Sequence, residues 1–265
     1  MFNAQTTFLN DKFEFHYIQI GDITDEFKVF LNNNLTSICK GEYHINELKY
    51  IKIQLKDFLR GKEKDENKKL GSISELYAHL FFKSLEFSNK FVFLNLEENS
   101  LKKGFDGFFE KAGEHWILDS KSGHYQTKNI SHRSKILEAN RSAKEQILGE
   151  TENNPWENAF NHANSGDVRA DESLLKVIRR FSNQYMDKNF IRPNELNVIL
   201  ASTIFLFDSW KEQTIDYLIT QLNNIDKNFD FAKTIIFCSN QKNYEDFINY
   251  LEEEDYGQRR EVTAN

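Results

Sequence analysis

Cysteine and proline are both scarce in this chain of 265 residues, which has two of each. Cys39 and Cys238 lie far apart in apolar settings, and neither belongs to a CxxC pair. This argues against a disulfide framework and against a zinc site, so both are expected to be reduced thiols in the core. Since only Pro155 and Pro193 are present, the ends of helices and strands are inferred from glycine, asparagine and charge.

Long apolar runs are also missing, and no segment approaches the length of a membrane span. The first twenty residues show no basic region followed by an apolar one, so no signal peptide is expected. Together with the reduced thiols, this predicts a cytoplasmic protein without a membrane partner. Apolar residues make up 39% of the chain and phenylalanine is frequent, with 24 copies, so the chain is expected to fold around an aromatic-rich core.

An excess of positive charge is absent as well, since the formal net charge is -7. This argues mildly against a general nucleic-acid coat protein. Charge is uneven, however, because the segment 121–144 carries six basic residues against the single acid Glu138, a local charge of +5. The basic residues are Lys121, Lys128, Arg133, Lys135, Arg141 and Lys144. They either hold phosphates or form a solvated helix face.

Hydrophobic periodicity predicts alternating helices and strands. Helices are expected over residues 25–38, 46–59, 72–87, 131–148, 171–186, 213–223 and 243–254. Strands are expected over residues 13–20, 90–96, 105–111, 115–121, 195–207 and 233–239. Gly113 lies in the turn of a hairpin formed by the third and fourth of these strands. Residues 61–71 and 151–170 resemble loops.

From residue 72 onward the expected order is helix, three strands, helix and a later strand. A mixed α/β fold with a central sheet is the natural arrangement for this order. Residues 1–70 are expected to form an N-terminal α/β extension and a candidate docking surface for a partner. Residues 71–265 are expected to form the core domain, with a helix and a strand added at its C-terminal end.

Two acids and a lysine meet in the predicted hairpin. In HWILDSK, residues 115–121, the period of two places Asp119 and Lys121 on one face of a strand. Asp106, in the sequence GFDG, lies on the partner strand and is beside Asp119 if the register allows it. Three other Asp/Glu-X-Lys triplets occur, but they lie on expected helices or a loop and are best explained as surface charge. Asp119 and Lys121 differ because they end an apolar strand.

Two close carboxylates repel each other, so a cation must hold them or one must take up a proton. Mg²⁺ suits such a pair, because it binds one or two carboxylates together with water and phosphate oxygens. Lys121 would then lie where a water attacks phosphorus. Glu75, on the preceding helix, is a candidate third carboxylate, acting directly or through water. Ser72 and Glu75 also match a capping box, which is a purely structural alternative.

This pattern resembles that of the PD-(D/E)XK nucleases. GFDG supplies the first acid, Asp106, and DSK supplies the second acid and the lysine, Asp119 and Lys121. The family core runs helix, three strands, helix, strand, an order that residues 72–205 reproduce, and Glu75 matches the acid of its first helix. The resemblance implies a restriction-endonuclease-like core and cleavage of DNA phosphodiester bonds, with Mg²⁺ as cofactor and Mn²⁺ as a substitute. No proline precedes Asp106, although one is common there in the family.

Within that superfamily the chain looks like the nuclease subunit of the Hachiman anti-phage defence system. This second resemblance depends on the GFDG hairpin, the helix ISELYAHLFFKSL, the flanking N-terminal region and the later strand VILASTIFLF. It implies an effector that cuts DNA and is restrained, until infection, by a partner helicase of superfamily two.

Two other classes of function stay open on the sequence. The chain could be a non-catalytic protein of the same fold that binds nucleic acid or a partner, or a scaffolding subunit that docks through its N-terminal region. Intact Asp106, Asp119 and Lys121 favour the nuclease. Among the basic residues, Lys128, Arg133 and Lys135 lie nearest the site in sequence and are the candidate phosphate contacts. Further candidates with less specific signals are His115 and His124 as metal ligand or base, and Tyr125 and Trp156 for base stacking.

Overall fold

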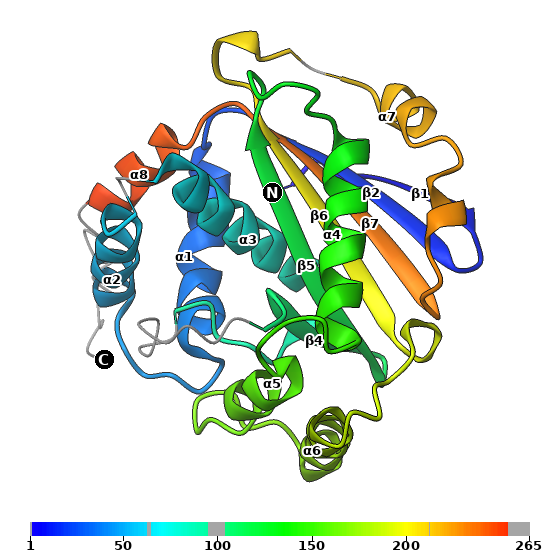
Figure 1. The fold of residues 1–265 in the computed structure, drawn as a ribbon. Coiled ribbons are helices and arrows are strands. Elements are labelled where there is room, and N and C mark those ends of the chain that lie inside the picture. Colours follow the sequence, from blue (N-terminus) through cyan, green and yellow to red (C-terminus); the bar gives the residue numbers. More distant parts are fainter. Residues whose placement is uncertain (1, 63–64, 95–103, 212, 254–265) are drawn as a thin grey trace, which may run out of the picture.

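The computed structural model describes residues 2–62, 65–94, 104–211 and 213–253. Within these ranges the chain is mixed α/β, as expected, with one seven-stranded mixed sheet in the order β1-β2-β7-β6-β5-β4-β3 (Figure 1). The strands are β1 (Gln5–Asn10), β2 (Phe13–Ile20), β3 (Ser88–Asn89), β4 (Gly107–Lys111), β5 (Glu114–His124), β6 (Asn197–Phe205) and β7 (Lys233–Gln241).

The middle of the sheet is parallel and its two margins are antiparallel. Strands β2, β7, β6 and β5 pair in parallel, whereas β1 pairs antiparallel with β2, and β4 pairs antiparallel with both β5 and β3. Strands β2, β6 and β7 are rich in Ile, Val, Phe and Leu, as expected of strands that are covered on both faces, whereas β5 is apolar only in its first half.

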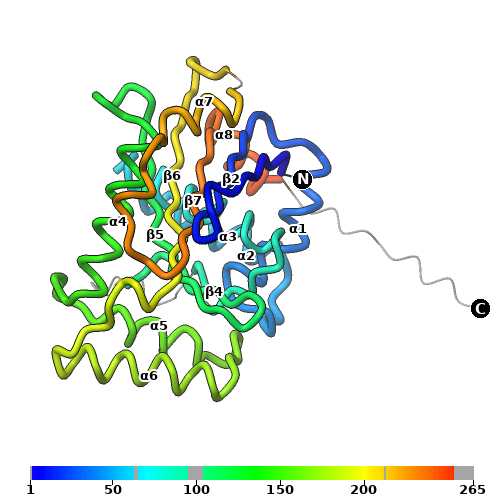
Figure 2. The backbone as a smooth tube through the Cα atoms, turned by 90° about the vertical axis from the view of Figure 1, so that its right-hand side faces the viewer, coloured from blue at the N-terminus to red at the C-terminus, as the bar shows by residue number. Residues whose placement is uncertain are grey.

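Eight α-helices in the described ranges cover the two faces of the sheet. They are α1 (Asp25–Lys40), α2 (Leu48–Arg60), α3 (Glu66–Ser84), α4 (His132–Ile147), α5 (Pro155–Ala163), α6 (Glu172–Met186), α7 (Ile215–Gln221) and α8 (Glu245–Glu252). Helices α1, α2, α3 and α8 share one hydrophobic core, and α4, α5, α6 and α7 share another. Figure 2 shows α4 on one side of the sheet and α1 and α2 on the other.

Alternation along each strand divides its side chains between the two cores. On β5, Trp116 and Leu118 pack into the core that contains α3, whereas Ile117 packs into the core that contains α4. The predicted hairpin is confirmed, with Ala112 and Gly113 at positive φ of 51° and 78° in the two-residue turn. Asp119 and Lys121 therefore belong to the α4 face of the sheet.

Helix α3 begins earlier than the sequence indicated. It starts at Glu66, where the Asp65 side chain accepts a hydrogen bond from Lys68 N, so most of the expected loop over residues 61–71 is helical. Ser72 lies inside this helix and its hydroxyl donates to Lys68 O. The capping-box interpretation of Ser72 and Glu75 is therefore wrong, because the N-terminal N–H groups that it would satisfy lie further upstream.

Two other expectations are corrected. Instead of a strand over residues 90–96, the chain has the short β3 at Ser88–Asn89, and residues 95–96 lie outside the described ranges. The expected loop over residues 151–170 contains α5, which is capped by Asn154 and has Pro155 in its first turn. Proline is favourable there, since the N–H it lacks has no partner in the first turn of a helix.

The N-terminal segment joins the same sheet as the rest of the chain. Strand β2 pairs with β7 over eight residues, and the boundary expected at residue 70 falls within α3. Helices α1 and α2 pack into the core shared with α3 and α8. In the described part of the chain, no helix is both long enough and apolar enough to cross a membrane.

Candidate active site

Asp119 and Lys121 form an ion pair in the second half of β5. The Asp119 side chain is only 1% exposed, whereas that of Lys121 is 23% exposed, and the ammonium group donates to Asp119 Oδ1. This half of the strand differs from the first half, because the register with β4 ends at Leu118. In the described ranges, no strand pairs with β5 beyond this point on the β4 side.

Asp106 lies where β4 leaves β5. Its backbone N–H donates to Leu118 O at 3.0 Å, and its Oδ2 accepts the backbone N–H of Ser120 at 2.7 Å. The carboxylate thus satisfies a backbone donor that β4 no longer pairs. The same hydrogen bond brings Asp106 next to Asp119 and Lys121. The structure therefore assembles the three residues that the sequence singled out.

Helix α4 adds a residue that the sequence did not indicate. Gln146 Nε2 donates to Asp119 Oδ2 at 3.2 Å. The Gln146 Oε1 atom is buried and has no hydrogen-bond partner in the described residues. Its signal in the sequence was weak, because Gln146 lies beside Ala143 and Ile147 on a helix whose buried stripe is apolar.

Burial raises the pKa of Asp119 to about 7, and the negative charge of Asp106 adds to this increase. The Lys121 ammonium and the Ser142 hydroxyl act in the opposite direction. Burial alone would lower the pKa of Lys121, but the charges of Asp119 and Asp106 outweigh it and hold that pKa above its ordinary value. The two carboxylates therefore share one ammonium, which leaves negative charge that a cation would neutralise.

Helix α3 supports the site from the opposite face of the sheet. The buried ring of His79 is hydrogen-bonded through Nε2 to the backbone oxygen of Asp106 at 2.9 Å. Eight residues earlier, a Cβ on Gly71 would lie 3.9 Å from Ser122 Oγ of β5. Glu75 lies one helical turn from each, on the stripe that runs along β5, and it is half-buried.

The carboxylates fit Mg²⁺ only in part. Asp106 and Asp119 offer hard oxygen ligands from adjacent positions, which is the donor set that Mg²⁺ prefers. In the described residues, however, no three His, Cys, Asp or Glu side chains gather closely enough to hold a metal ion. Glu75 therefore does not complete a three-ligand cluster in this geometry, and its role as a metal ligand or as a water-mediated contact stays a prediction.

The predicted phosphate contacts differ in availability. Lys128 is exposed in the segment between β5 and α4 and has no hydrogen bond or ion pair within the described ranges. Arg133 donates to the backbone oxygen of Asn223 at 3.0 Å, and Lys135 pairs with Glu138 at 2.9 Å. A phosphate would have to compete with these partners, so Lys128 is the most accessible of the three.

The aromatic candidates for base stacking also differ in how accessible they are. Trp156 is 1% exposed and packs edge-on against Phe105 and Phe181, so its expected availability for base stacking is corrected: it is a core residue. Tyr125 is half-buried and stacks on His124. His115 is half-buried at the start of β5, where its ring stacks on Phe108, away from the acidic pair.

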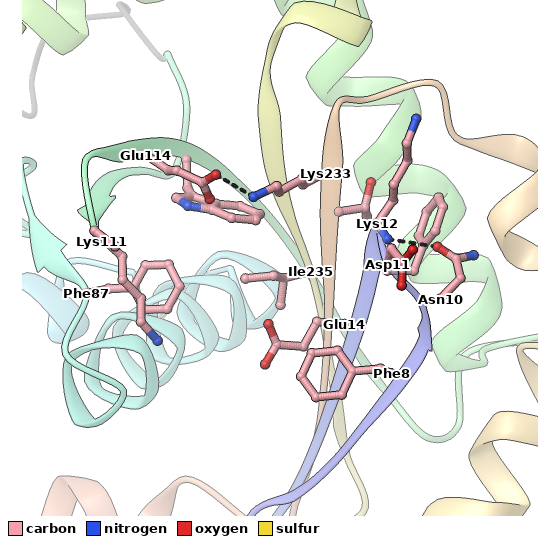
Figure 3. Close-up of a pocket in the computed structure, with 14 residues that line it drawn as sticks. Phe8, Asn10, Asp11, Lys12, Glu14, Phe87, Lys111, Glu114, Lys233 and Ile235 are labelled. Atoms are coloured by element: carbon pink, nitrogen blue, oxygen red, sulfur yellow. Dashed lines mark hydrogen bonds and ion pairs between the residues drawn. The ribbon is translucent and has the colours of Figure 1, made fainter.

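A separate cavity of about 300 Å³ lies at the amino ends of the parallel strands (Figure 3). Phe8, Phe87 and Ile235 line it, and Figure 3 also shows the ion pair between Glu114 and Lys233 beside it. Asp106, Asp119 and Lys121 do not belong to its lining. This cavity is therefore distinct from the charged cluster.

Neither a protein-family model nor a curated protein matches this chain. The argument for a function therefore depends on the side chains and the geometry described above. The feature that best suggests a chemical role is the cluster of Asp106, Asp119 and Lys121, which lies where β4 no longer pairs with β5.

Proposed function

We propose that this chain is a Mg²⁺-dependent nuclease that hydrolyses DNA phosphodiester bonds. The observation that carries the proposal is the convergence of Asp106, Asp119 and Lys121 on one face of the sheet, beside an edge that β4 leaves unpaired. The buried carboxylate of Asp119, beside the half-buried Asp106 and with one lysine between them, is costly as a purely structural device. The same arrangement is useful where a cation and a phosphate must meet.

Each residue has a distinct task in the proposed reaction. Asp106 and Asp119 would hold Mg²⁺, which, when bound, would polarise the phosphate and offset charge in the transition state. Lys121 would orient the attacking water and stabilise the negative charge that builds up as the new P–O bond forms. Gln146 holds the Asp119 carboxylate in place through its Oδ2 atom. The oxygen that leaves phosphorus must receive a proton, for which water is the available donor.

The order of elements supports a restriction-endonuclease-like core. Helix α3, the strands β3, β4 and β5, helix α4 and the later strand β6 follow each other along the chain, with α5 and α6 inserted before β6. In the antiparallel hairpin followed by the parallel β5–β6 pair, Asp119 and Lys121 lie on the central strand of this unit, and Asp106 lies just before β4. The restriction-endonuclease-like fold of residues 66–205 remains part of the proposal.

A non-catalytic role is the second candidate, and one observation favours it. Both oxygens of Asp119 already have partners, Lys121 at Oδ1 and Gln146 at Oδ2. This closed arrangement would also serve a nuclease-fold subunit that only binds nucleic acid or a protein. The two candidates differ in whether replacing Asp119 changes chemistry or only stability.

The proposal extends to an anti-phage effector restrained by a helicase of superfamily two. This part rests on the resemblance to the Hachiman nuclease subunit and on the net charge of -7. A negative net charge weakens attraction to the DNA backbone, so a partner chain would supply strong DNA binding. The test should therefore include the chain alone and the chain co-expressed with the product of the neighbouring gene.

Cleavage of supercoiled plasmid with and without Mg²⁺ tests the nuclease. We expect Asp119→Asn and Lys121→Met each to reduce the cleavage rate by at least about 100-fold, because each removes charge stabilisation at the reacting phosphate. The matched control is Asp216→Asn on α7, an acid outside the cluster, which should cleave at the wild-type rate.

Thermal unfolding of each variant separates chemistry from folding. If Asp119→Asn folds and still cleaves in Mg²⁺ at the wild-type rate, the assignment is wrong. If the wild type cleaves no nucleic acid with Mg²⁺ or Mn²⁺, alone or with its co-expressed partner, the non-catalytic candidate replaces it.

A further inference from the structure

Three aromatic rings stack at the carboxyl end of the strand that carries Asp119 and Lys121. The His124 ring lies between Tyr125, at a centroid distance of 4.8 Å, and Phe207, at 4.7 Å, with interplanar angles of 27° and 22°. All three side chains are half-buried, so the stack is not enclosed in a core. We call these residues the aromatic stack.

The backbone is strained at Phe207, one of the three residues of the aromatic stack. Phe207 has a positive φ of 45°, which is rare for a bulky residue and tends to persist only where the surroundings enforce it. Its N–H donates to Lys242 O, and its ring packs edge-on against Tyr244 at 5.9 Å. Lys69 of α3 lies over the Tyr244 ring at 4.4 Å. Three separate parts of the chain therefore hold the aromatic stack in place.

The stack occupies a position where α/β sheets commonly bind ligands. It lies at the carboxyl ends of β5 and β6, and the chain leaves β6 toward the α7 side but leaves β7 toward the α8 side. Crevices of this kind, where neighbouring connections diverge to opposite faces, are frequent binding positions. The exposed cation Lys128 follows three residues after Tyr125.

The face on which the stack lies restricts the shape of a nucleic acid that could use it. His124 lies three residues beyond Lys121 on β5, or about 10 Å along the strand. Because side chains alternate, Lys121 faces α4 and His124 faces α3. His124 is covered by Tyr125 and Phe207, so the ring that a base can reach is that of Tyr125, the next residue along the chain. A base that stacks on this ring must expose a face, as an unpaired base of a single strand does and a base inside a duplex does not.

We propose that the aromatic stack binds unpaired bases of a nucleic acid strand whose backbone passes the Asp106–Asp119–Lys121 cluster. This inference rests on the proposed nuclease function and narrows its substrate to single-stranded or locally unpaired nucleic acid. The outer face of Tyr125 is the platform for the base, since His124 covers the other face. Lys128, three residues after Tyr125, and Asp208, next to Phe207, are both exposed, so ring stacking would add to a phosphate contact at Lys128.

The test measures binding of a fluorescein-labelled oligothymidylate and of a duplex of equal length to the full chain in EDTA. The wild type should prefer the single strand. Tyr125→Ala should weaken single-strand binding by about 5- to 100-fold, the usual loss for one stacked base. Tyr125→Phe keeps the ring and should bind within about 3-fold of the wild type. The control is Tyr217→Ala on α7, which removes an exposed tyrosine outside the aromatic stack and should have no effect.

A 2-aminopurine base in the oligonucleotide reports stacking directly, since its fluorescence is quenched against an aromatic ring. Quenching by the wild type and by Tyr125→Phe, but not by Tyr125→Ala, supports the inference even if no variant cleaves. Equal affinity and equal quenching for Tyr125→Ala and the wild type would overturn it even if the chain is an active nuclease. Failure of the wild type to bind the single strand would also overturn it.

Discussion

His132, at the start of α4, is a fully buried histidine whose protonation follows from its neighbours. Asn240 Nδ2 donates to the Tyr17 hydroxyl at 3.0 Å, so its Oδ1 is free to accept from His132 Nε2, also at 3.0 Å. His132 Nδ1 then accepts from the Ser202 hydroxyl at 2.8 Å. The ring is therefore neutral, with its proton on Nε2. Burial lowers the pKa of His132 to about 4, although the Asn240 side chain and the Ser202 backbone oppose this decrease.

This histidine should make the fold sensitive to mild acid. Because its pKa is lower in the folded state than in the unfolded state, its contribution is present above about pH 6.5 and is lost as the pH falls toward about 4. Between about pH 7.5 and pH 5 the free energy of unfolding should fall by about 2 kcal/mol on account of this residue. Urea unfolding of the wild type and of His132→Gln at both pH values measures the difference.

His132→Gln should lose about 2 kcal/mol less than the wild type over that pH interval. The replacement also alters hydrogen bonds, but it does so equally at both pH values. Comparing the change in free energy of unfolding between pH 7.5 and pH 5 therefore removes that contribution. His115→Gln, at a half-buried histidine of the hairpin, controls for replacing a histidine elsewhere. Identical pH dependence of the wild type and His132→Gln would contradict the assignment of a neutral buried ring.

At the scale of elements, the contact between α3 and β4 positions the first acid of the site. A Cβ at Gly107 would lie 2.9 Å from the Phe109 ring and 3.0 Å from His79 Cε1, and both of those side chains are buried. Glycine is therefore needed for the helix to approach the strand closely enough for His79 to reach the Asp106 carbonyl at 2.9 Å. The second glycine of GFDG, Gly107, thus serves the packing that holds Asp106 in place.

Gly107→Ala should displace His79 and disturb Asp106. We expect a loss of about 1–3 kcal/mol in the free energy of unfolding, which is typical of overpacking in a buried contact. We also expect slower plasmid cleavage by the folded variant, because Asp106 would lose the hydrogen bond that holds its backbone. Urea unfolding and the plasmid assay measure the two effects.

The matched control is Gly166→Ala. No atom lies within 4 Å of a Cβ at Gly166, so the free energy of unfolding should change by less than about 0.5 kcal/mol. Equal stability and equal cleavage for Gly107→Ala and the wild type would show that α3 does not hold Asp106.

At the scale of the whole molecule, the N-terminal region contributes to the central sheet and to both cores. Removing residues 1–64 would delete β1, β2, α1 and α2 and expose the edge of β7. Five of the fully buried side chains lost are Phe15, Ile18, Leu31, Leu35 and Leu55. At roughly 2 kcal/mol each, they supply on the order of 10 kcal/mol, which is comparable to the net stability of a typical domain.

A fragment that starts at residue 65 should therefore fail to fold. We expect it to lack a cooperative unfolding transition by circular dichroism and to aggregate on size exclusion, whereas the full chain should unfold cooperatively. If the fragment instead unfolds with a sharp transition, residues 1–70 are a separable extension, as the sequence indicated. Partner docking through that region would then not need to disturb the core.

Local patterns were sufficient for much of the fold and for part of the site. Alternation along residues 115–121 placed Asp119 and Lys121 on one face, and Gly113 marked the hairpin turn, because both depend on neighbours within a few residues. The helix over residues 131–148 was also predictable, since Ser131 provides a local cap. Pro155, by contrast, suggested a loop where it opens a helix.

The sequence by itself determined which charged residues come together on the hairpin, because the period of a strand and the geometry of a tight turn are local properties. Only the tertiary structure decided what surrounds those residues: Gln146 on Asp119, His79 on the Asp106 carbonyl, and β2 beside β7. These contacts join segments separated by 27 residues or more, so they depend on how the helices pack across both faces of one sheet. No local pattern encodes that packing, since many partners can satisfy the same apolar stripe.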